Sequence, residues 1–509
     1  MLRNIKFILL LVTLITLISY LKPKISSTAI PTHNLTTEVL GSGSIEPAGG
    51  SYKKNSIVPI QALPYSGWSF DHWQGDLSGA ENPTRIRMTS DKHVIAVFTE
   101  QQPDPTPSPT PTDPPSPTPT PSPTTEEVVG YFVQWGIYKR SFYVKNILTS
   151  GSADTLTVVN YAFAGIDENL NCTILDKFAD YEKAFDASQS IDGVADTFSQ
   201  PLRGNFNQLR KLKQMYPNIK VLISIGGWTE SYRFSDAALP ENRQAFVSSC
   251  IGMFINGNFA SGVIDPTIFD GIDIDWEYPG RCGATCNFRP EDTVNFTALL
   301  AEFRTQLDAI DPNLLLTIAS PAGEYYYSAI ELDKIHQYVD WINLLTYDFH
   351  GSWEPNGPTN HHSPLYGSPG DPTFAGSSND TVLAYISSGV PSEKLVMGLP
   401  FYGRGWAGVA NINNGLYQSA NRIPRGTYER GIDDFEVLEN KGYPGFWDPI
   451  AQTYWIYDGF EFWSYDNATS VTNKMNYIKA MNLRGVMFWE LSGDDPSGTL
   501  INAISNGLK

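Results

Sequence analysis

The sequence of 509 residues predicts an α/β protein: a (β/α)8 TIM barrel with an α+β insertion between its seventh and eighth strands, plus a small N-terminal all-β module. Three observations lead to this fold class. A stretch of Pro, Thr and Ser divides the chain into a short and a long part. Eight apolar runs rich in strand-forming residues alternate with helical patterns in the long part. Acidic residues recur at every second position where the fourth of these runs ends.

The first residues of the chain have the pattern of a secretory signal. A short basic start precedes an apolar run, residues 7–21, that is too short for a comfortable membrane span, and small residues follow at positions 27–29. We therefore assign residues 1–31 as a signal peptide and expect a secreted, extracellular protein. Lys22 and Lys24, directly after the run, leave an uncleaved signal anchor as the alternative.

Residues 32–100 predict the small all-β module. Its short apolar runs, separated by Gly, Pro and Asn turns, are residues 56–62, 68–73 and 93–98. Trp68 and Trp73 either stack on sugar or belong to the core of the module. Residues 101–125 alternate Pro with Thr and Ser and have almost no apolar side chains, so we expect an extended linker there.

Residues 126–509 form the predicted barrel domain. Its eight runs are residues 128–133, 156–163, 220–227, 271–277, 314–320, 341–348, 395–400 and 485–490. Runs that alternate with helical patterns predict a parallel sheet wrapped by helices, and eight of them predict a barrel. The interval of about 407–466, rich in Tyr, Phe, Trp and Gly, is too long for one helix and predicts an inserted α+β subdomain.

Charge and composition limit the partners of the protein. The formal net charge of −19 disfavours nucleic acid and anionic membranes and is compatible with a neutral or basic substrate, although an acidic balance also serves solubility alone. The 12 Trp and 26 Tyr residues indicate surfaces that stack on flat ligands such as sugar rings. The four cysteines suit disulfides outside the cell and leave three pairings open: Cys172, Cys250, Cys282 and Cys286.

The segment from Asp270 to Glu277 carries the strongest chemical signal. Asp273, Asp275 and Glu277 recur with period two, so they share the strand face that points into the barrel. Glu277 is then outermost at the C-terminal mouth, where barrel active sites form, and Asp273 is deepest. Neighbouring members lie about 7 Å apart by strand rise. Burial and mutual repulsion should raise at least one pKa, as a proton donor near neutral pH requires.

A calcium site or a solvated acidic strand is the alternative for this segment. The apolar residues Ile272, Ile274 and Trp276 alternate with the acids, which indicates a strand buried on both faces and disfavours both alternatives. Three histidines after the sixth run lack the spacing of a zinc enzyme, and we interpret them as loop structure: His350, His361 and His362. We expect no metal and no cofactor.

Several separated motifs resemble glycoside hydrolase family 18, the chitinases, over about residues 126–509. Residues 224–228, Ser-Ile-Gly-Gly-Trp, match the family's SxGG signature, and residues 270–277 match its DxxDxDxE signature in full. Residues 345–348 match its MxYD motif with Leu345 in place of Met, a volume-conserving exchange. The insertion resembles a subdomain that deepens the groove in one branch of the family. Segments of the N-terminal module resemble divergent bacterial surface repeats.

The resemblance implies hydrolysis of β-1,4 linkages between N-acetylglucosamine units with retention of configuration. The substrate's own acetamido oxygen would attack the anomeric carbon and form an oxazolinium intermediate. Glu277 would protonate the leaving oxygen and then activate water. Asp275 would accept the acetamido N–H, and Tyr347 would hydrogen-bond the acetamido oxygen.

The resemblance also assigns positioning and binding residues. Asp273, steadied by Tyr131 and Ser224, would exchange a proton with the next acid on the strand. Asp348 would hold the twisted sugar, and Trp489 would form the floor of the central subsite. Further residues at substrate-binding positions are Trp228 and Trp353, both on the leaving-group side, and Tyr402, Arg404, Phe163, Gly226 and Gly227. Trp135 and Trp406 are additional candidates for stacking.

Two other functions are compatible with the sequence. An endo-β-N-acetylglucosaminidase acting on glycans or peptidoglycan would use the same acidic motif, although the tryptophans and the insertion favour chitin and chitooligosaccharides as partners. A non-catalytic chitin-binding lectin on the same barrel typically lacks the proton-donating Glu, and Glu277 is present. We expect a monomer that binds neither nucleic acid nor, apart from a signal anchor, a membrane. Endo or exo action, processivity and the chain end attacked stay open.

Overall fold

The computed structural model describes residues 31–64, 68–80, 82, 84–100, 126–373 and 375–509. Residues 1–30 of the predicted signal and the whole predicted linker, residues 101–125, lie outside the described residues. The chain forms two compact units, Met1–Thr118 and Pro119–Lys509.

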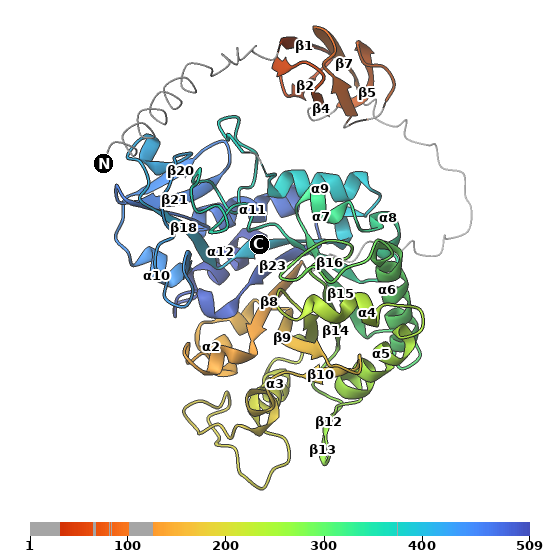
Figure 1. Cartoon of the computed structure of the whole chain (residues 1–509), viewed down its shortest axis with the longest axis vertical. Helices are drawn as coiled ribbons and strands as arrows, with labels where there is room; N and C mark the ends of the chain where they lie inside the picture. Colours follow the sequence, from red (N-terminus) through yellow and green to blue (C-terminus); the bar gives the residue numbers. More distant parts are fainter. Residues whose placement is uncertain (1–30, 65–67, 81, 83, 101–125, 374) are drawn as a thin grey trace, which may run out of the picture. The chain divides into compact units, whose positions relative to one another are not determined.

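Two β-sheets make up the N-terminal unit, which confirms the predicted all-β module (Figure 1). One sheet contains, in order, β3 (Gly50–Lys53), β1 (Thr32–Leu40), β7 (Lys92–Glu100) and β5 (Trp68–Gly75), and the other contains β2 (Gly43–Glu46), β4 (Ile57–Pro64) and β6 (Thr84–Arg87). Trp73 is 1% exposed and lies in the core between the sheets' apolar residues. Trp73 is therefore a core residue and not a sugar-stacking one. Trp68 is partly buried and packs against the same core.

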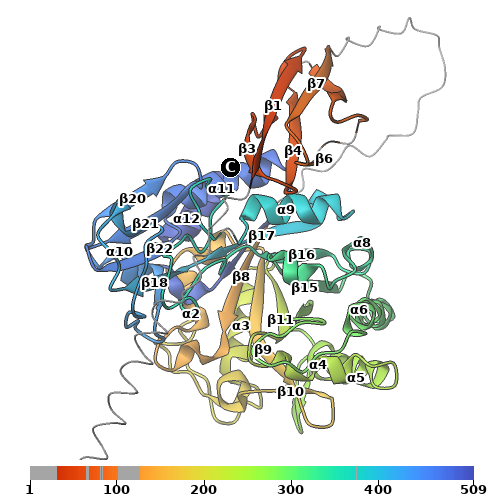
Figure 2. The same ribbon diagram turned by 45° about the horizontal axis from the view of Figure 1, so that its top comes forward.

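Eight parallel strands close into a barrel in the C-terminal unit, and each overlaps one of the predicted runs (Figure 2). In order around the barrel they are β8 (Glu127–Val133), β9 (Val158–Ile166), β11 (Lys220–Gly226), β14 (Gly271–Asp275), β15 (Leu315–Pro321), β16 (Trp341–Leu345), β17 (Leu395–Pro400) and β23 (Gly485–Trp489). β8 pairs with both β9 and β23, which closes the sheet. All residues of β9 are buried, as expected for a strand covered on both faces. The predicted TIM barrel is confirmed.

Helices surround the barrel on its outer face (Figure 1). They are α2 (Val144–Thr149), α3 (Gly204–Met215), α4 (Phe234–Ala237), α5 (Arg243–Cys250), α6 (Asp292–Asp308), α7 (Glu324–Tyr327), α8 (Leu332–Ile335), α9 (Ser378–Ser387), α11 (Ala468–Ala480) and α12 (Thr499–Leu508). In α6 the buried apolar residues recur at a spacing of three and four, which forms one apolar face: Phe296, Leu299, Leu300, Phe303 and Leu307. In the described parts of the chain, no helix has the length and apolar character needed to cross a bilayer.

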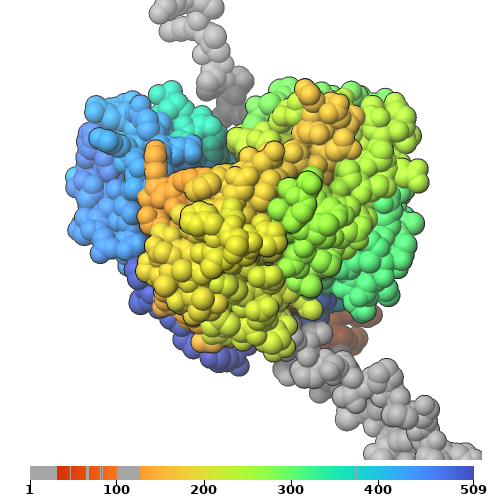
Figure 3. Space-filling model, turned by 90° about the horizontal axis from the view of Figure 1, so that it is seen from below, coloured from red at the N-terminus to blue at the C-terminus, as the bar shows by residue number. Residues whose placement is uncertain are grey.

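A five-stranded antiparallel sheet with a short helix, α10 (Phe435–Glu439), lies between β17 and β23 in the chain, where the α+β insertion is predicted. Its strand order is β19 (Ile432–Asp434), β18 (Tyr402–Ala407), β22 (Glu461–Tyr465), β21 (Thr453–Tyr457) and β20 (Gly445–Asp448). Trp406 is fully buried and donates its ring N–H to the carbonyl of Glu354 (2.9 Å). Trp406 thus belongs to the core of the insertion and presents no stacking surface. The insertion, in blue, stands beside the orange and yellow segments that follow β8 and β9 (Figure 3).

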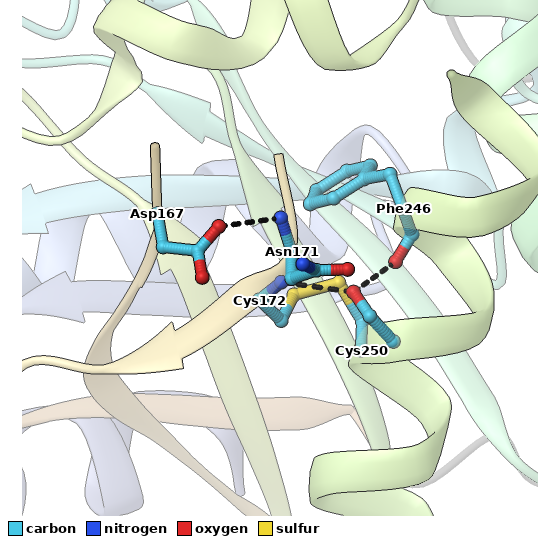
Figure 4. The surroundings of a disulfide bond; sticks show 6 residues. Asp167, Asn171, Cys172, Phe246 and Cys250 are labelled. Carbon is cyan, nitrogen blue, oxygen red and sulfur yellow. Dashed lines mark hydrogen bonds between the residues drawn. A yellow bond between two sulfur atoms is a disulfide. The ribbon is translucent and has the colours of Figure 1, made fainter. Parts of the chain in front are cut away.

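Two disulfides decide among the three possible cysteine pairings. Cys172 pairs with Cys250, and Cys282 pairs with Cys286. The first bond joins β10 (Cys172–Ile174) to the end of α5, where the N–H of Cys172 also donates to Ser249 Oγ (2.9 Å; Figure 4). The second bond closes a short loop directly after the acidic segment.

Candidate active site

The acidic segment forms β14 and the turn that follows it at the C-terminal mouth of the barrel. Its two isoleucines pack outward in the core shared with the helices. Asp273 lies on the opposite face, inside the barrel, and its side chain contacts strands on both sides of β14. Parallel pairing places Ser224 of β11 and Thr317 of β15 level with Asp273. The alternation is the one that the sequence predicts.

Asp273 is fully buried and accepts four hydrogen bonds. Its Oδ2 accepts from Tyr131 Oη (2.8 Å) and Ser224 Oγ (2.7 Å). Its Oδ1 accepts from Thr317 Oγ1 (2.5 Å) and Asn343 Nδ2 (3.3 Å). Burial raises the pKa of this carboxyl, and the hydrogen bonds oppose that rise. Tyr131 and Ser224 thus lie beside the deepest acid, where the family resemblance implies them.

Asp275 lies one step nearer the mouth and is 5% exposed. Burial, followed by the charges of Glu277 and Asp273, raises the pKa of Asp275 well above its usual value. Its Oδ1 is buried and has no hydrogen-bond partner among the described residues. A buried carboxyl oxygen without a partner is destabilising, so this atom is an acceptor ready for a ligand N–H.

Glu277 follows β14 at the rim of the mouth. Its backbone N–H donates to Ser231 Oγ (2.9 Å), and Ser231 Oγ donates to the carbonyl of Gly227 (2.8 Å). Burial raises the pKa of Glu277 to about 7, while a hydrogen bond from Tyr278 lowers it and the charge of Asp348 raises it. A carboxyl with this pKa is partly protonated at neutral pH and can donate a proton to a bound ligand.

Tyr347 and Asp348 follow β16 at the same mouth. Arg404 binds the Asp348 carboxylate with two nitrogens, Nε at 2.8 Å from Oδ1 and Nη2 at Oδ2, and His362 Nδ1 lies 3.5 Å from Oδ1. Burial alone would raise the pKa of Asp348, but Arg404 and His362 outweigh it and hold this pKa well below its usual range. Asp348 is therefore an anion at neutral pH. Burial also raises the pKa of Tyr347, which keeps its hydroxyl protonated and able to donate.

Aromatic side chains line the mouth. The Trp489 ring stacks on Phe163 with centroids 5.6 Å apart and contacts Tyr131 at 5.4 Å. Trp135, 42% exposed, lies 6.4 Å from Trp489 and extends this surface. Such a surface suits the apolar face of a sugar ring.

Two further tryptophans stand at loops after β11 and β16. Trp228 is 53% exposed and Trp353 is 54% exposed, so both rings are open to a ligand. The guanidinium of Arg404 lies 5.1 Å from the Trp353 ring and 5.4 Å from the Tyr402 ring. Tyr402 in turn meets Tyr347 edge to face at 6.2 Å. The ion pair between Arg404 and Asp348 thus also positions the rings of Trp353 and Tyr402.

Gly226 and Gly227 allow β11 to approach its neighbours. Both have positive φ, 110° and 81°. A Cβ on Gly226 would lie 2.3 Å from the Asp275 carbonyl oxygen, and one on Gly227 would lie 2.6 Å from the Phe163 ring. These glycines, expected among the substrate-binding residues, position Asp275 and Phe163 through close backbone contact.

Five residues at the site escaped the sequence analysis as functional residues. Thr317 and Asn343 are polar residues inside apolar runs, which is a signal that could have indicated them. Ser231 begins a short 3-10 helix after β11 and Tyr278 lies in the loop after β14, both outside the parts of the motifs that carried a role. His362 was interpreted as loop structure, and the structure places it beside Asp348.

The other two histidines of this loop pair with carboxylates. His350 Nδ1 lies 3.0 Å from Glu354, and His361 Nε2 lies 3.3 Å from Asp448. Within the residues that the structure describes, no three His, Cys, Asp or Glu side chains are grouped so as to hold a metal ion.

Comparison with known proteins places these features in a family. Residues 127–494 match the family described as Glycosyl hydrolases family 18, and residues 33–102 match the Divergent InlB B-repeat domain. Chitinase C of Streptomyces lividans is 43% identical over 375 residues, which are 73% of this chain and 58% of the relative. The chain thus spans less than two thirds of the length of this curated relative.

Solved structures share the same barrel. The catalytic domain of psychrophilic chitinase B from Arthrobacter TAD20 matches with a TM-score of 0.72 and 38% identity, covering 75% of this chain and 95% of that one. A glycoside hydrolase family 18 N-acetylglucosaminidase from Paenibacillus barengoltzii matches with a TM-score of 0.60 and 30% identity, covering 75% and 100%. The family match covers well over half of the chain, and both family signatures end at the barrel mouth. This chain belongs to glycosyl hydrolase family 18.

Proposed function

We propose that the protein is a secreted chitinase that hydrolyses β-1,4 linkages between N-acetylglucosamine units by substrate-assisted, retaining catalysis. One observation carries this proposal: Glu277, with a pKa of about 7, stands next to Asp275, whose Oδ1 has no partner among the described residues. A proton donor beside a vacant acceptor suits a sugar that offers both a leaving oxygen and an acetamido N–H. The similarity to proteins named chitinases supports it.

In the first step the acetamido oxygen of the substrate forms a bond to the anomeric carbon as the glycosidic C–O bond breaks. Glu277 gives its proton to the leaving oxygen. Asp275 Oδ1 accepts the acetamido N–H and offsets the positive charge of the oxazolinium ion. The protonated hydroxyl of Tyr347 hydrogen-bonds the acetamido oxygen and aligns it for attack.

In the second step water attacks the anomeric carbon and the oxazolinium ring opens. Glu277, now a carboxylate, takes a proton from this water and returns to its starting state. Asp273, which accepts hydrogen bonds from Tyr131 and Ser224, exchanges a proton with Asp275 as Asp275 turns toward the substrate. Two displacements at one carbon leave the product in the β-configuration.

The remaining site residues bind the chain of sugars. Trp489, stacked on Phe163, forms the floor of the central subsite, and the anionic Asp348 holds the distorted sugar through its hydroxyls. Trp228 and Trp353 bind sugars on the leaving-group side through their exposed rings. Arg404 contacts the rings of Trp353 and Tyr402 and so helps to position Trp353.

An endo-β-N-acetylglucosaminidase is the second candidate. The same acids would cleave any substrate with a 2-acetamido group, and a family 18 N-acetylglucosaminidase is among the similar structures. Product analysis on chitin hexamer and on a glycoprotein separates the two. We also propose a signal peptide at 1–31, a linker at 101–125 between module and barrel domain, export from the cell and a monomeric state.

The test of the mechanism uses partly acetylated chitosan. A glucosamine unit has no acetamido oxygen and forms no oxazolinium ion, so cleavage requires N-acetylglucosamine on the non-reducing side of the bond. NMR of early products should show N-acetylglucosamine at the new reducing ends, initially as the β-anomer. Abundant glucosamine there, or initial α-anomer, would contradict the proposal. EDTA should leave the rate unchanged, since every role belongs to a side chain or to the substrate.

A further inference from the structure

A row of three tyrosines leads outward from the catalytic acid to the rim of the barrel. Tyr278, which hydrogen-bonds Glu277, lies 4.3 Å from the ring of Tyr326. Tyr326 meets Tyr325 edge to face at 5.1 Å. Tyr325, in the short helix α7 after β15, is 64% exposed. The last ring of the row is therefore open to solvent while its neighbours are partly covered.

Tyr325 is held in place by a loop that follows the catalytic acid. Arg281 Nε donates to the backbone carbonyl of Tyr325 (2.8 Å), and its guanidinium lies 4.8 Å from the Tyr325 ring. The Cys282–Cys286 disulfide closes this loop directly after Arg281. A Cβ on Gly283 would lie 2.1 Å from the Glu277 carbonyl oxygen, so the loop packs on the backbone of the acid itself.

The order of strands places Tyr325 between the two tryptophans that we assign to the leaving-group side. β14 and β15 lie between β11 and β16 in the barrel. The loops after β11 and β16 carry Trp228 and Trp353, to which we assign the leaving-side sugars. Tyr325 follows β15, within the same arc of the mouth.

An exposed aromatic ring alone is ordinary at a protein surface. Tyr325 differs from such a ring because Arg281 binds both its backbone and its ring, and Tyr326 supports one edge. A ring immobilised before binding loses little conformational entropy when a ligand stacks on it. Sugar rings have flat apolar faces that suit this kind of contact.

We propose that Tyr325, positioned by Arg281 and the Cys282–Cys286 loop, forms an additional subsite that binds the third sugar on the leaving-group side of the scissile bond. The occupant is an N-acetylglucosamine ring of the same chain that Trp228 and Trp353 bind. This inference rests on the proposed chitinase function and extends it: the enzyme prefers to release leaving-side fragments of three or more sugars.

The experiment measures where chitin hexamer is cut, in water enriched in oxygen-18. The attacking water labels the new reducing end, so the leaving-side fragment is the unlabelled one, and early products are counted by mass spectrometry. Tyr325→Ala should lower the ratio of unlabelled trimer to unlabelled dimer about three- to tenfold, the range for one aromatic stacking contact. Tyr325→Phe and Tyr325→Trp should keep the wild-type ratio, because each retains a ring.

Controls separate this subsite from a general effect of the substitutions. Phe460, in the turn between β21 and β22, is the matched control because its ring is also exposed and also contacts an arginine, Arg422. Phe460→Ala should keep the wild-type ratio. Cys282→Ser with Cys286→Ser should lower the ratio in the same direction as Tyr325→Ala, because Arg281 is then less firmly held. An unchanged ratio in Tyr325→Ala, with normal hexamer cleavage, overturns the subsite and leaves the chitinase proposal standing. A wild-type enzyme that leaves hexamer intact overturns both.

Discussion

Two groups of carboxyls, each at least partly buried, meet at the mouth of one barrel, and they differ in whether a cation binds them. Asp273 and Asp275 on β14 and Glu277 directly after it, here called the β14 acids, interact with hydroxyls, an amide and one another, and burial raises the pKa of each. Asp348, after β16, is bound by Arg404, which holds its pKa below the usual range despite burial. The pKa values of the two groups are therefore shifted in opposite directions, although burial acts to raise the pKa in both.

The difference indicates a division of labour at the mouth. Burial without a cation raises the pKa of a carboxyl, and Glu277, with a pKa of about 7, is partly protonated near neutral pH, as proton exchange with a substrate requires. A carboxylate with a bidentate arginine keeps a fixed negative charge and a fixed position. We expect the β14 acids to transfer protons and Asp348 to bind substrate as a fixed anion.

Replacing the outermost acid should have the largest effect. Glu277→Gln preserves shape and removes only the transferable proton, so kcat on chitin hexamer should fall about a thousandfold while hexamer binding stays within about threefold. Steady-state kinetics and calorimetry give the two numbers. Glu436→Gln, an isosteric change at an exposed position in α10, is the matched control and should retain full activity. Equal losses of binding and turnover in Glu277→Gln would contradict a role in proton transfer.

Removing Arg404, the cation that binds Asp348, should lower the stability of the protein as well as its activity. Arg404→Met leaves the partly buried Asp348 carboxylate without its partner, and we expect a loss of about 2 kcal/mol in the free energy of unfolding at pH 7, less than for a fully buried pair. The folded-state pKa of Asp348 lies below its unfolded value, so the pair's contribution is fully present above about pH 4 and fades as pH falls through the folded pKa.

Urea unfolding of the wild type and Arg404→Met at pH 7 and near pH 3 measures this contribution, and the gap between them should narrow at the lower pH. The double variant Arg404→Met with Asp348→Asn should recover part of the loss, because no charge is then left unpaired. A single variant as stable as the wild type at pH 7 would show that Asp348 gains little from its cation.

The two carboxyl groups also differ in how well the sequence predicts them. The sequence predicts that the β14 acids lie together because they recur at every second position of one short segment. Alternate residues of a single strand share one face, so this pattern is kept in the folded structure. The partners of Asp273 and Asp348 are distant: Thr317 is 44 residues from Asp273, and Arg404 is 56 residues from Asp348. Local patterns contain no information on such contacts. The barrel was predicted for the same reason as the acids, since each strand and helix has its own local period, whereas the insertion was predicted from an interval too long for one helix.

Resemblance to a family supplied part of what local pattern could not. It indicated Arg404 and Tyr402 at the site, but it did not indicate that Arg404 pairs with Asp348 or that His362 lies beside this pair. The cysteine pairing depended equally on the fold: Cys172 and Cys250 are 78 residues apart and meet only because β10 lies against α5.

Neutralising Asp348 should move the pH profile of the β14 acids. The charge of Asp348 raises the pKa of Glu277, so in Asp348→Asn that pKa falls, and the unpaired Arg404 lowers it further. We expect the alkaline limb of kcat/KM near pH 7 in the wild type, because Glu277 must be protonated, and at a pH lower by about one unit in Asp348→Asn. Asn tolerates the positive φ of 59° at this position, so the backbone is kept. An unshifted limb would mean that the two groups are electrostatically independent.

The smallest effect should come from the hydrogen bond between Tyr278 and Glu277, and it should have the opposite sign. Tyr278 stabilises the carboxylate form of Glu277 and so lowers its pKa. Tyr278→Phe removes that bond and keeps the ring that packs on Tyr326. The pKa of Glu277 should then rise, and the alkaline limb of kcat/KM should move to higher pH by up to about one unit, with the plateau rate changed less than about threefold.

Tyr278→Phe distinguishes a change in the pKa of Glu277 from a general disturbance of the active site. A disturbed active site lowers the rate at every pH, whereas loss of one hydrogen bond to a carboxylate shifts the limb and leaves the plateau nearly intact. Because Asp275 and Glu277 titrate together, the limb reports the pair, so its position should be compared between variants. Opposite shifts in Asp348→Asn and Tyr278→Phe can arise only if the limb belongs to the β14 acids. Shifts of the same sign would assign it to another group, and the contrast between the two sides of the mouth would no longer explain the pH dependence.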